Sequence, residues 1–157
     1  MTQETSKLDA NDRSIIVELQ ADASLSQRAL AERVGISQNA CWRRLQRLES
    51  EGVLGAPKAS VDYARLGFDL TAMVFIKTPH HSGDWARRFR EHVRKLPGVI
   101  DLYRIGGEWD YMIRVVTRGI AGYDEFYRRL VEGFELSVVN GHFVMERVIE
   151  EQPLDLR

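Results

Sequence analysis

The stretch S-Q-R-A-L-A-E-R-V-G-I-S-Q-N-A-C-W-R-R-L-Q-R-L-E-S-E-G, residues 26–52, decides the fold of the first half of the chain. Ser26 is a good N-cap for a helix, because its hydroxyl can accept a backbone N–H that the first turn leaves unpaired. Gly35 falls where that helix must end in the left-handed conformation, which is free of steric cost only for glycine. Ser37 can cap a longer helix over residues 38–51. Two helices separated by a short turn that contains a glycine are typical of a helix-turn-helix.

A further helix is expected before this stretch. Asp9 can cap it, and Ile15 and Leu19 recur at helical spacing on one side. Residues 1–53 are therefore expected to form one helical domain. Residues 54–69 contain a proline and two glycines among short apolar pieces without helical period, which predicts a linker strand.

The rest of the chain alternates between strand and helix patterns. Strands are expected at residues 70–77, 99–105, 111–117 and 137–149, and amphipathic helices at residues 84–96 and 123–131. The order β-α-β-β-α-β is typical of the ferredoxin-like split motif. We therefore predict an α+β protein, in which a winged-helix-like helix-turn-helix domain precedes a ferredoxin-like domain over residues 70–157.

Composition excludes several classes of protein. The 157 residues include 22 Lys plus Arg and 23 Asp plus Glu, a net charge of −1, so the chain carries no polybasic tail. Its single cysteine, Cys41, cannot form an internal disulfide. No apolar run approaches the roughly 18 to 20 residues of a membrane span. Met1 to Leu8 shows no signal-peptide core, which predicts a cytoplasmic protein with no membrane partner.

The longer helix has two chemically different sides. On a helical wheel Cys41, Leu45 and Leu48 share one side, and the opposite side carries amide and guanidinium groups. Amides pair with adenine and guanidinium groups with guanine in the major groove, and the helix N-termini suit phosphate. Three arginines alone would equally describe a solvated helix face, and Trp42 is more simply packed against the linker. The predicted DNA-binding residues are Gln27, Ser37, Gln38, Asn39, Trp42, Arg43, Arg44, Gln46 and Arg47.

A second candidate site is the loop G-G-E-W-D, residues 106–110, between two predicted strands. Its glycines leave backbone N–H groups open to close approach, and Glu108 and Asp110 supply carboxylates. An α-amino acid offers a carboxylate and an ammonium, so the loop can meet both ends, with Arg104 as a further partner for the carboxylate. The same sequence is equally consistent with a plain hairpin turn in which Trp109 only packs.

Both halves resemble the Lrp/AsnC family, the feast/famine regulators of bacteria and archaea. The first resemblance lies in L-D-A-N-D-R-S-I-I-V-E-L-Q (8–20) and L-A-E-R-V-G-I-S-Q-N-A-C-W-R-R-L-Q-R-L-E-S-E-G-V-L (30–54). The second lies in the G-E-W-D loop and a closing V-M-E strand. The runs C-W-R-R-L-Q-R-L-E, I-K-T-P-H-H-S and Y-D-E-F-Y-R-R-L-V look nearest to the branch that senses cysteine and activates cysteine-degrading genes.

The resemblance implies a sequence-specific transcriptional regulator of amino-acid metabolism. It would bind double-stranded DNA as homodimers that associate to a higher oligomer, an octamer, and would take a small amino-acid effector, favoured as L-cysteine, at the loop between neighbouring dimers. Trp109 stands where Tyr or Phe is common in the family, which suits a small effector. The effector residues expected from the loop, the strand before it, the following turn and the last strand are Arg104, Gly106, Gly107, Glu108, Trp109, Asp110, Ile120 and His142.

Two other classes of function were weighed. An architectural DNA-binding protein of the same fold would need no effector and would use the loop only as a turn. An enzyme is not expected, because the sequence contains no G-x-S-x-G, phosphate loop, dinucleotide fingerprint or H-E-x-x-H. No two of its four histidines have metal-ligand spacing, so no catalytic residue, metal or cofactor is predicted.

Overall fold

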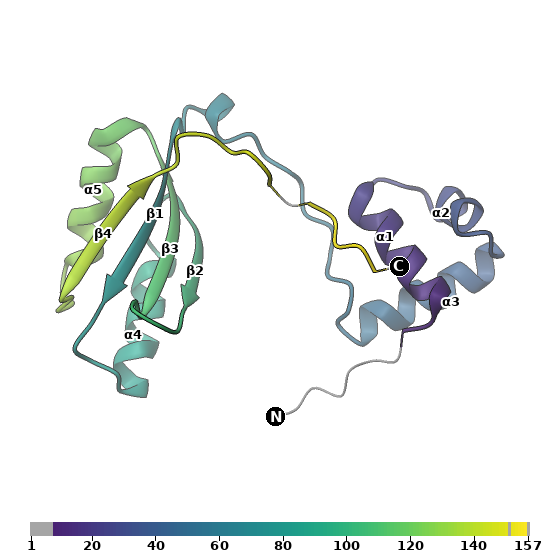
Figure 1. Cartoon of the computed structure of the whole chain (residues 1–157), viewed down its shortest axis with the longest axis horizontal. Helices are drawn as coiled ribbons and strands as arrows, with labels where there is room; N and C mark the ends of the chain where they lie inside the picture. Colours follow the sequence, from purple (N-terminus) through teal and green to yellow (C-terminus); the bar gives the residue numbers. More distant parts are fainter. Residues whose placement is uncertain (1–7, 151, 157) are drawn as a thin grey trace. The chain divides into compact units, whose positions relative to one another are not determined.

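The computed structural model describes residues 8–150 and 152–156, so nearly all of the stretch examined for a signal peptide, Met1 to Leu8, lies outside the described residues. The chain forms two compact units (Figure 1). One comprises the described residues up to Ser60 together with those from Ile149 onward, and the other comprises Val61–Val148. No helix of the described part is long and apolar enough to cross a membrane.

The first unit is built from three helices, α1 (Ala10–Ala21), α2 (Gln27–Val34) and α3 (Gln38–Ser50). The predicted caps are confirmed: the hydroxyls of Ser26 and Ser37 accept the backbone N–H groups of Ala29 and Ala40, each at 3.2 Å. Gly35 has φ of 75°, the left-handed conformation that ends α2 and allows the sharp turn into α3.

The helices enclose an apolar core that includes Ile15, Leu30 and Leu48. Cys41 is fully buried there, and burial raises the pKa of its thiol, so it behaves as a small apolar side chain. Leu156, near the end of the chain, packs against the same core.

The second unit is a four-stranded antiparallel sheet with two helices (Figure 1). Its elements are β1 (Leu70–Lys77), α4 (Gly83–Arg94), β2 (Val99–Arg104), β3 (Tyr111–Thr117), α5 (Gly119–Val131) and β4 (Val138–Phe143), preceded by the 3-10 turn η1 (Ala64–Leu66). The strand order β2-β3-β1-β4 is that of the predicted ferredoxin-like split motif. The predicted α+β fold class is therefore confirmed.

One face of the sheet is covered and the other is open. Alternate residues of β1, such as Val74 and Ile76, are fully buried against Phe89 of α4 and Leu130 of α5. The intervening residues of β1 are only partly buried, because the sheet carries its helices on the first face. An uncovered sheet face with apolar side chains is a surface for another molecule.

Two sequence predictions of strands are wrong. The last strand ends at Phe143 instead of residue 149, because Phe143 lies opposite Ala72 and β1 begins only two residues before that position. After it the N–H of Val144 still donates to the carbonyl of Thr71 at 2.9 Å, and the chain then passes the start of β1. The predicted linker strand over residues 54–69 is absent as well: this segment contains only the turn η1, and it has no partner backbone that would make a strand.

Candidate functional site

The side of α3 opposite Cys41 and Leu48 is open to solvent. Three of the predicted DNA-binding side chains are exposed there, Asn39, Arg43 and Gln46, and Gln38 is exposed in the first turn of the helix. Asn39, Arg43 and Gln46 are spaced i, i+4 and i+7, so they form one stripe along the helix. Ser37 is exposed at the helix N-terminus, and Gln27 is half-buried at the start of α2. The stripe presents two amides and one guanidinium, the groups that read base edges.

Trp42 lies beside this stripe and is 53% exposed. It lines a hollow of about 400 Å³ together with Leu45 of α3 and Pro57 of the linker. Trp42 thus borders this hollow and is still about half exposed, so its contact with DNA and its packing role both stay predictions.

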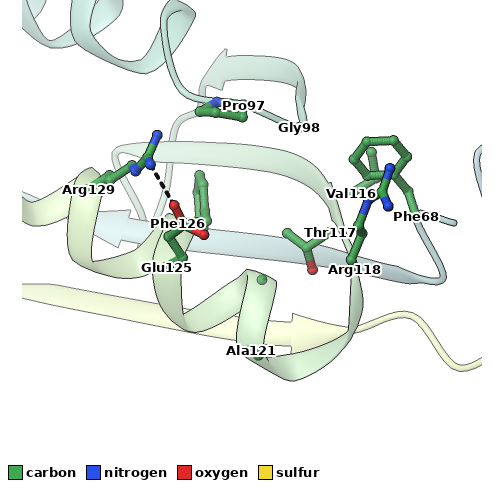
Figure 2. A pocket seen from close by; sticks show the side chains of 11 residues that line it. Phe68, Pro97, Gly98, Val116, Thr117, Arg118, Ala121, Glu125, Phe126 and Arg129 are labelled. Atoms are coloured by element: carbon green, nitrogen blue, oxygen red, sulfur yellow. Dashed lines mark hydrogen bonds and ion pairs between the residues drawn. The ribbon is translucent and has the colours of Figure 1, made fainter.

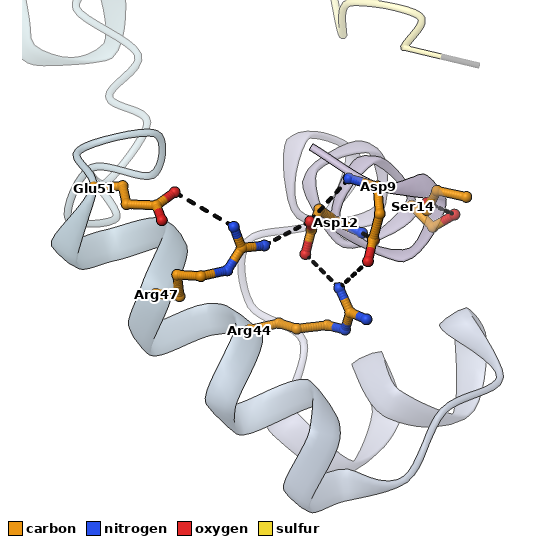
Figure 3. A network of polar contacts seen from close by, with 7 residues as sticks. Asp9, Asp12, Ser14, Arg44, Arg47 and Glu51 are labelled. Atoms are coloured by element: carbon orange, nitrogen blue, oxygen red, sulfur yellow. Dashed lines mark hydrogen bonds and ion pairs between the residues drawn. The ribbon is translucent and has the colours of Figure 1, made fainter. Parts of the chain in front are cut away.

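Arg44 and Arg47 are held in a network that the sequence analysis did not anticipate (Figure 3). The Nη1 atom of Arg44 lies 2.7 Å from carboxylate oxygens of both Asp9 and Asp12. The Nη2 atom of Arg47 lies 2.6 Å from the other oxygen of Asp12, and its Nη1 atom lies 3.5 Å from Glu51. Two arginines of α3 therefore clamp the first turn of α1.

Asp12 is the centre of this clamp, and its side chain is only 1% exposed. Burial by itself raises the pKa of the carboxyl, but hydrogen bonds from Arg47, the backbone N–H of Asp9 and Arg44 lower it to about 2. The same carboxylates raise the pKa of Arg44 and Arg47. Asp9 and Asp12 also exchange side-chain and backbone hydrogen bonds in a capping box. The network is thus fully ionised at neutral pH and holds α1 against α3.

The loop of residues 106–110 is anchored to the end of β1. The backbone N–H of Asp110 donates to the carbonyl of Ile76 at 2.9 Å, and the Asp110 carbonyl accepts from the N–H of Ile105 at 3.0 Å. One carboxylate oxygen of Asp110 accepts the backbone N–H of Thr78 at 2.8 Å. The other lies 3.9 Å from Nδ1 of His81. Asp110 is therefore fixed in place, and its side chain is 31% exposed.

The aromatic residue of the loop is held against the open sheet face. The Nζ atom of Lys77 lies 3.1 Å from Glu108 and 4.8 Å from the centre of the Trp109 indole ring. On its other side Trp109 contacts Phe75, whose ring meets His142 edge-on. His142, Trp109 and Glu108 thus belong to one cluster, although they come from different strands and the loop.

The two loop glycines leave backbone accessible. A Cβ atom added to Gly106 or Gly107 would meet no atom within 4 Å, and Gly107 has φ of 105°, which other residues rarely adopt. Arg104, at the end of β2 next to this loop, is exposed. The hairpin therefore offers accessible backbone N–H groups, and Arg104 is paired in register with Tyr111 at the start of β3.

Ile120 is not brought to this loop within one chain. It is 60% exposed at the start of α5, just beyond Thr117. The loop precedes Tyr111, so the seven residues of β3 separate the two positions. At about 3.3 Å per residue that separation is roughly 20 Å. A site that used both positions would need a second chain.

The sequence analysis missed residues at both sites. The sequence predicts only a capping role for Asp9 and no role for Asp12. The two aspartates are three residues apart, the same i, i+3 spacing that separates Arg44 from Arg47. Lys77 and His81 lie in the I-K-T-P-H-H-S run, but their proximity to the loop depends on the β1–β3 register, which the sequence does not show. Among the described residues no group of three or more His, Cys, Asp or Glu side chains could hold a metal ion.

Comparisons with known protein families agree with both halves of the fold. Residues 71–154 match the model of the Lrp/AsnC ligand binding domain, and residues 8–54 match a winged helix-turn-helix DNA-binding model. The DNA-binding transcriptional activator DecR of Escherichia coli (strain K12) is 44% identical over 142 residues, which cover 90% of this chain and 93% of that protein. The glutamate uptake regulatory protein of Zymomonas mobilis is 37% identical, and the match covers 90% of this chain and 87% of that protein.

Two solved structures of transcriptional regulators are similar to this chain over nearly its whole length. An AsnC family transcriptional regulator from Agrobacterium tumefaciens has a TM-score of 0.88 and 39% identity, and the match covers 95% of this chain and 97% of that one. A transcriptional regulator from Neisseria meningitidis in complex with L-Met has a TM-score of 0.87 and 26% identity, with the same coverage.

Proposed function

The chain belongs to the Lrp/AsnC family of DNA-binding transcriptional regulators, and we propose that it controls genes of amino-acid metabolism in response to a small amino acid, with L-cysteine as the favoured effector. Its relatives are transcriptional regulators and not enzymes. The observation that carries the effector proposal is the Asp110 carboxylate: one oxygen accepts the Thr78 amide N–H, and the other lies 3.9 Å from His81, beyond hydrogen-bond distance.

Sequence-specific contacts would come from the exposed stripe of α3. Arg43 is the strongest candidate for a guanine contact, because it lies in the middle of the stripe and no acidic side chain of the Asp9–Asp12 clamp binds it. Arg44 and Arg47 would act chiefly by holding α3 at its angle on α1. The remaining predicted contacts, all to bases or phosphates, stay part of the proposal: Gln27, Ser37, Gln38, Asn39, Trp42 and Gln46.

The effector loop suits an α-amino acid at both of its charged ends. The Asp110 oxygen that faces His81 would accept the ammonium, and the N–H groups beside Gly106 and Gly107, with Arg104, would receive the carboxylate. Lys77 and Phe75 hold the Trp109 ring in place, which would limit the space left for the side chain of the ligand. A small effector such as L-cysteine fits this restriction.

The complete site would form between chains. Ile120 lies roughly one strand length from the loop, so a neighbouring chain would have to supply it. Two chains would form a homodimer through the open sheet face, which carries Met73, Phe75 and Met112. Further association of dimers to an octamer would bring the loop of one dimer next to an α5 helix of another. An effector at such a junction would act by its different affinity for two arrangements of the dimers.

A thermal-shift screen against all twenty amino acids at millimolar concentration tests the effector proposal. We expect a rise in Tm with L-cysteine that Asp110→Ala removes, because a ligand that binds only the folded state stabilises it. Asp124→Ala, which removes an exposed carboxylate on α5, is the matched control and should keep the response. A protein that responds to no amino acid yet binds DNA normally would favour the effector-independent architectural function.

A further inference from the structure

A second hollow lies at the end of the sheet opposite the 106–110 loop (Figure 2). Its volume is about 420 Å³, within the roughly 300 to 1,000 Å³ of ordinary small-molecule sites. Phe126 of α5, which is 3% exposed, lines it, and Pro97 stands on the opposite wall. The hollow is therefore bounded by α5, the end of β3 and the turn between α4 and β2.

The wall formed by that turn is rigid. Gly98 has φ of 78°, and a Cβ atom there would lie 2.1 Å from the carbonyl oxygen of Val116. The Gly98 carbonyl in turn accepts the N–H of Val116 at 2.9 Å. The turn is thus locked onto β3, and the hollow is a feature of the backbone as well as of side-chain positions.

Charged groups stand at the two ends of the hollow (Figure 2). At one end the guanidinium carbon of Arg118 lies 5.1 Å from the centre of the Phe68 ring, so the cation is stacked on an aromatic face. A guanidinium stacked in this way keeps its N–H donors in the plane of the group, where a carboxylate can bind with two parallel hydrogen bonds. At the other end Arg129 pairs with Glu125.

We propose that this hollow binds a small monocarboxylate with an apolar body, the class that contains apolar amino acids and their 2-oxo acids. The carboxylate would pair with Arg118, and the apolar body would lie between Phe126 and Pro97. If the ligand is an amino acid, its ammonium would approach Glu125. A phosphate or another fully hydrophilic anion would leave the apolar lining unused, so it fits less well.

The proposal goes beyond the effector site, because the two sites share no residue. The hollow is reached past Thr117 at one end of β3, whereas the loop ends at Tyr111, roughly 20 Å away along the strand. Arg118→Gln therefore leaves every residue of the 106–110 loop unchanged, and Asp110→Ala leaves every residue of the hollow unchanged. A regulator with both would respond to two metabolites separately.

Isothermal titration calorimetry on the full-length protein with L-leucine, its 2-oxo acid and isovalerate tests the proposal. These ligands share a carboxylate and a branched apolar body and differ in the group that would face Glu125. We expect binding that survives in Asp110→Ala, weakens about tenfold or more in Arg118→Gln, and is lost in Ala121→Phe, whose ring would fill the hollow. Tighter binding of leucine than of the other two would support the contact with Glu125.

Arg128→Gln is the matched control, because it removes an exposed arginine from the same helix outside the hollow and should bind normally. Circular dichroism melts establish that Arg118→Gln and Ala121→Phe are folded. The proposal is overturned if no ligand binds Asp110→Ala, since all binding would then belong to the effector loop, or if Arg118→Gln binds as tightly as the wild type. Binding of L-cysteine to Arg118→Gln reports on the effector loop independently.

Discussion

At the scale of single residues, Asp12 explains why three arginines on one helix are not equivalent. Arg44 forms ion pairs with Asp12 and Asp9, and Arg47 forms one with Asp12, whereas Arg43 remains exposed. The three look alike in the sequence, because a helical wheel places residues around one helix and says nothing about which acid a neighbouring helix presents. The stripe that faces outward was predictable; the clamp was not, since it depends on how α1 packs against α3.

Asp12→Asn should destabilise the first unit by about 2–3 kcal/mol. The amide keeps an oxygen for the capping hydrogen bond but removes the anion that the two arginines share. The cost stays below that of a fully buried pair because Arg44 keeps Asp9, Arg47 keeps Glu51, and both arginines retain contact with water. Urea denaturation measures it. Asp124→Asn on α5, where the ion pair is exposed, should cost less than about 0.5 kcal/mol, and equal costs for the two substitutions would contradict the clamp.

The same residue should make stability depend on acid pH. The pKa of Asp12 falls from 3.8 to about 2 on folding, so the unfolded chain takes up this proton first as the pH is lowered. Its stabilising contribution is complete above pH 4 and is lost as the pH falls toward 2. We expect the Tm of the wild type to drop more steeply across this window than the Tm of Asp12→Asn. Parallel curves would show that Asp12 is not the group responsible.

Arg43→Ala should weaken specific DNA binding by about 1–3 kcal/mol and leave the thermal stability of the first unit unchanged. Arg44→Ala should lower the thermal stability of the first unit, because it removes one of the two arginines of the clamp. Fluorescence anisotropy with an operator selected from random sequence, together with Tm, separates the two effects. If Arg44→Ala loses DNA affinity and Arg43→Ala does not, the bases contact a different side of α3 from the one proposed.

At the scale of elements, local signals predicted the helices and three of the four strands closely. Ser26, Gly35 and Ser37 act within one turn of their own position, so their capping roles could be read without any tertiary information. The end of β4 could not, because a strand ends where its partner ends, and the partner is distant in sequence. The effector loop was recognised by its glycines and acids, but Thr78 and His81 reach it only through the pairing of β1 with β3.

The C-terminal segment is an element that sequence patterns did not reveal. The side-chain amide of Gln20 on α1 accepts the N–H of Leu154 at 2.9 Å and donates to its carbonyl at 3.4 Å, and Leu156 packs on the helical core. Gln20→Ala should release this segment at a cost of about 1 kcal/mol. Hydrogen exchange at the Leu154 amide should become faster, whereas Gln38→Ala, a matched change on α3, should leave it protected. Unchanged exchange in Gln20→Ala would show that the segment is held by other contacts.

At the scale of the whole molecule, the net charge of −1 and the clamp both indicate that a single subunit attracts DNA only weakly. With two of the three α3 arginines neutralised internally, each subunit offers a weak electrostatic attraction to DNA, so useful affinity would come from several subunits bound together. The open sheet face supplies an apolar surface for that association. The fold of each unit was predictable from the chain; the assembly was not, because complementarity between surfaces leaves no periodic signal.

Met112→Lys should dissociate the assembly while each unit stays folded. Met112 lies on β3 opposite Phe75, and a lysine on this face would be desolvated in a dimer. Multi-angle light scattering should give a lower mass, and DNA affinity should fall with it. Val148→Lys, at an exposed position outside the strands, is the control and should retain the wild-type mass. A wild-type mass for Met112→Lys would place the interface elsewhere.

The central claim is that the 106–110 loop binds a small amino acid through Asp110. Calorimetric titration of the full-length protein with L-cysteine, beside L-serine as the oxygen analogue, tests it most directly. We predict saturable binding of L-cysteine in the wild type and at least about a tenfold loss of affinity in Asp110→Ala, the expected cost of removing a charge-assisted contact to the ammonium. Equal affinity in the wild type and Asp110→Ala, or no binding of L-cysteine to the wild type, would contradict the account.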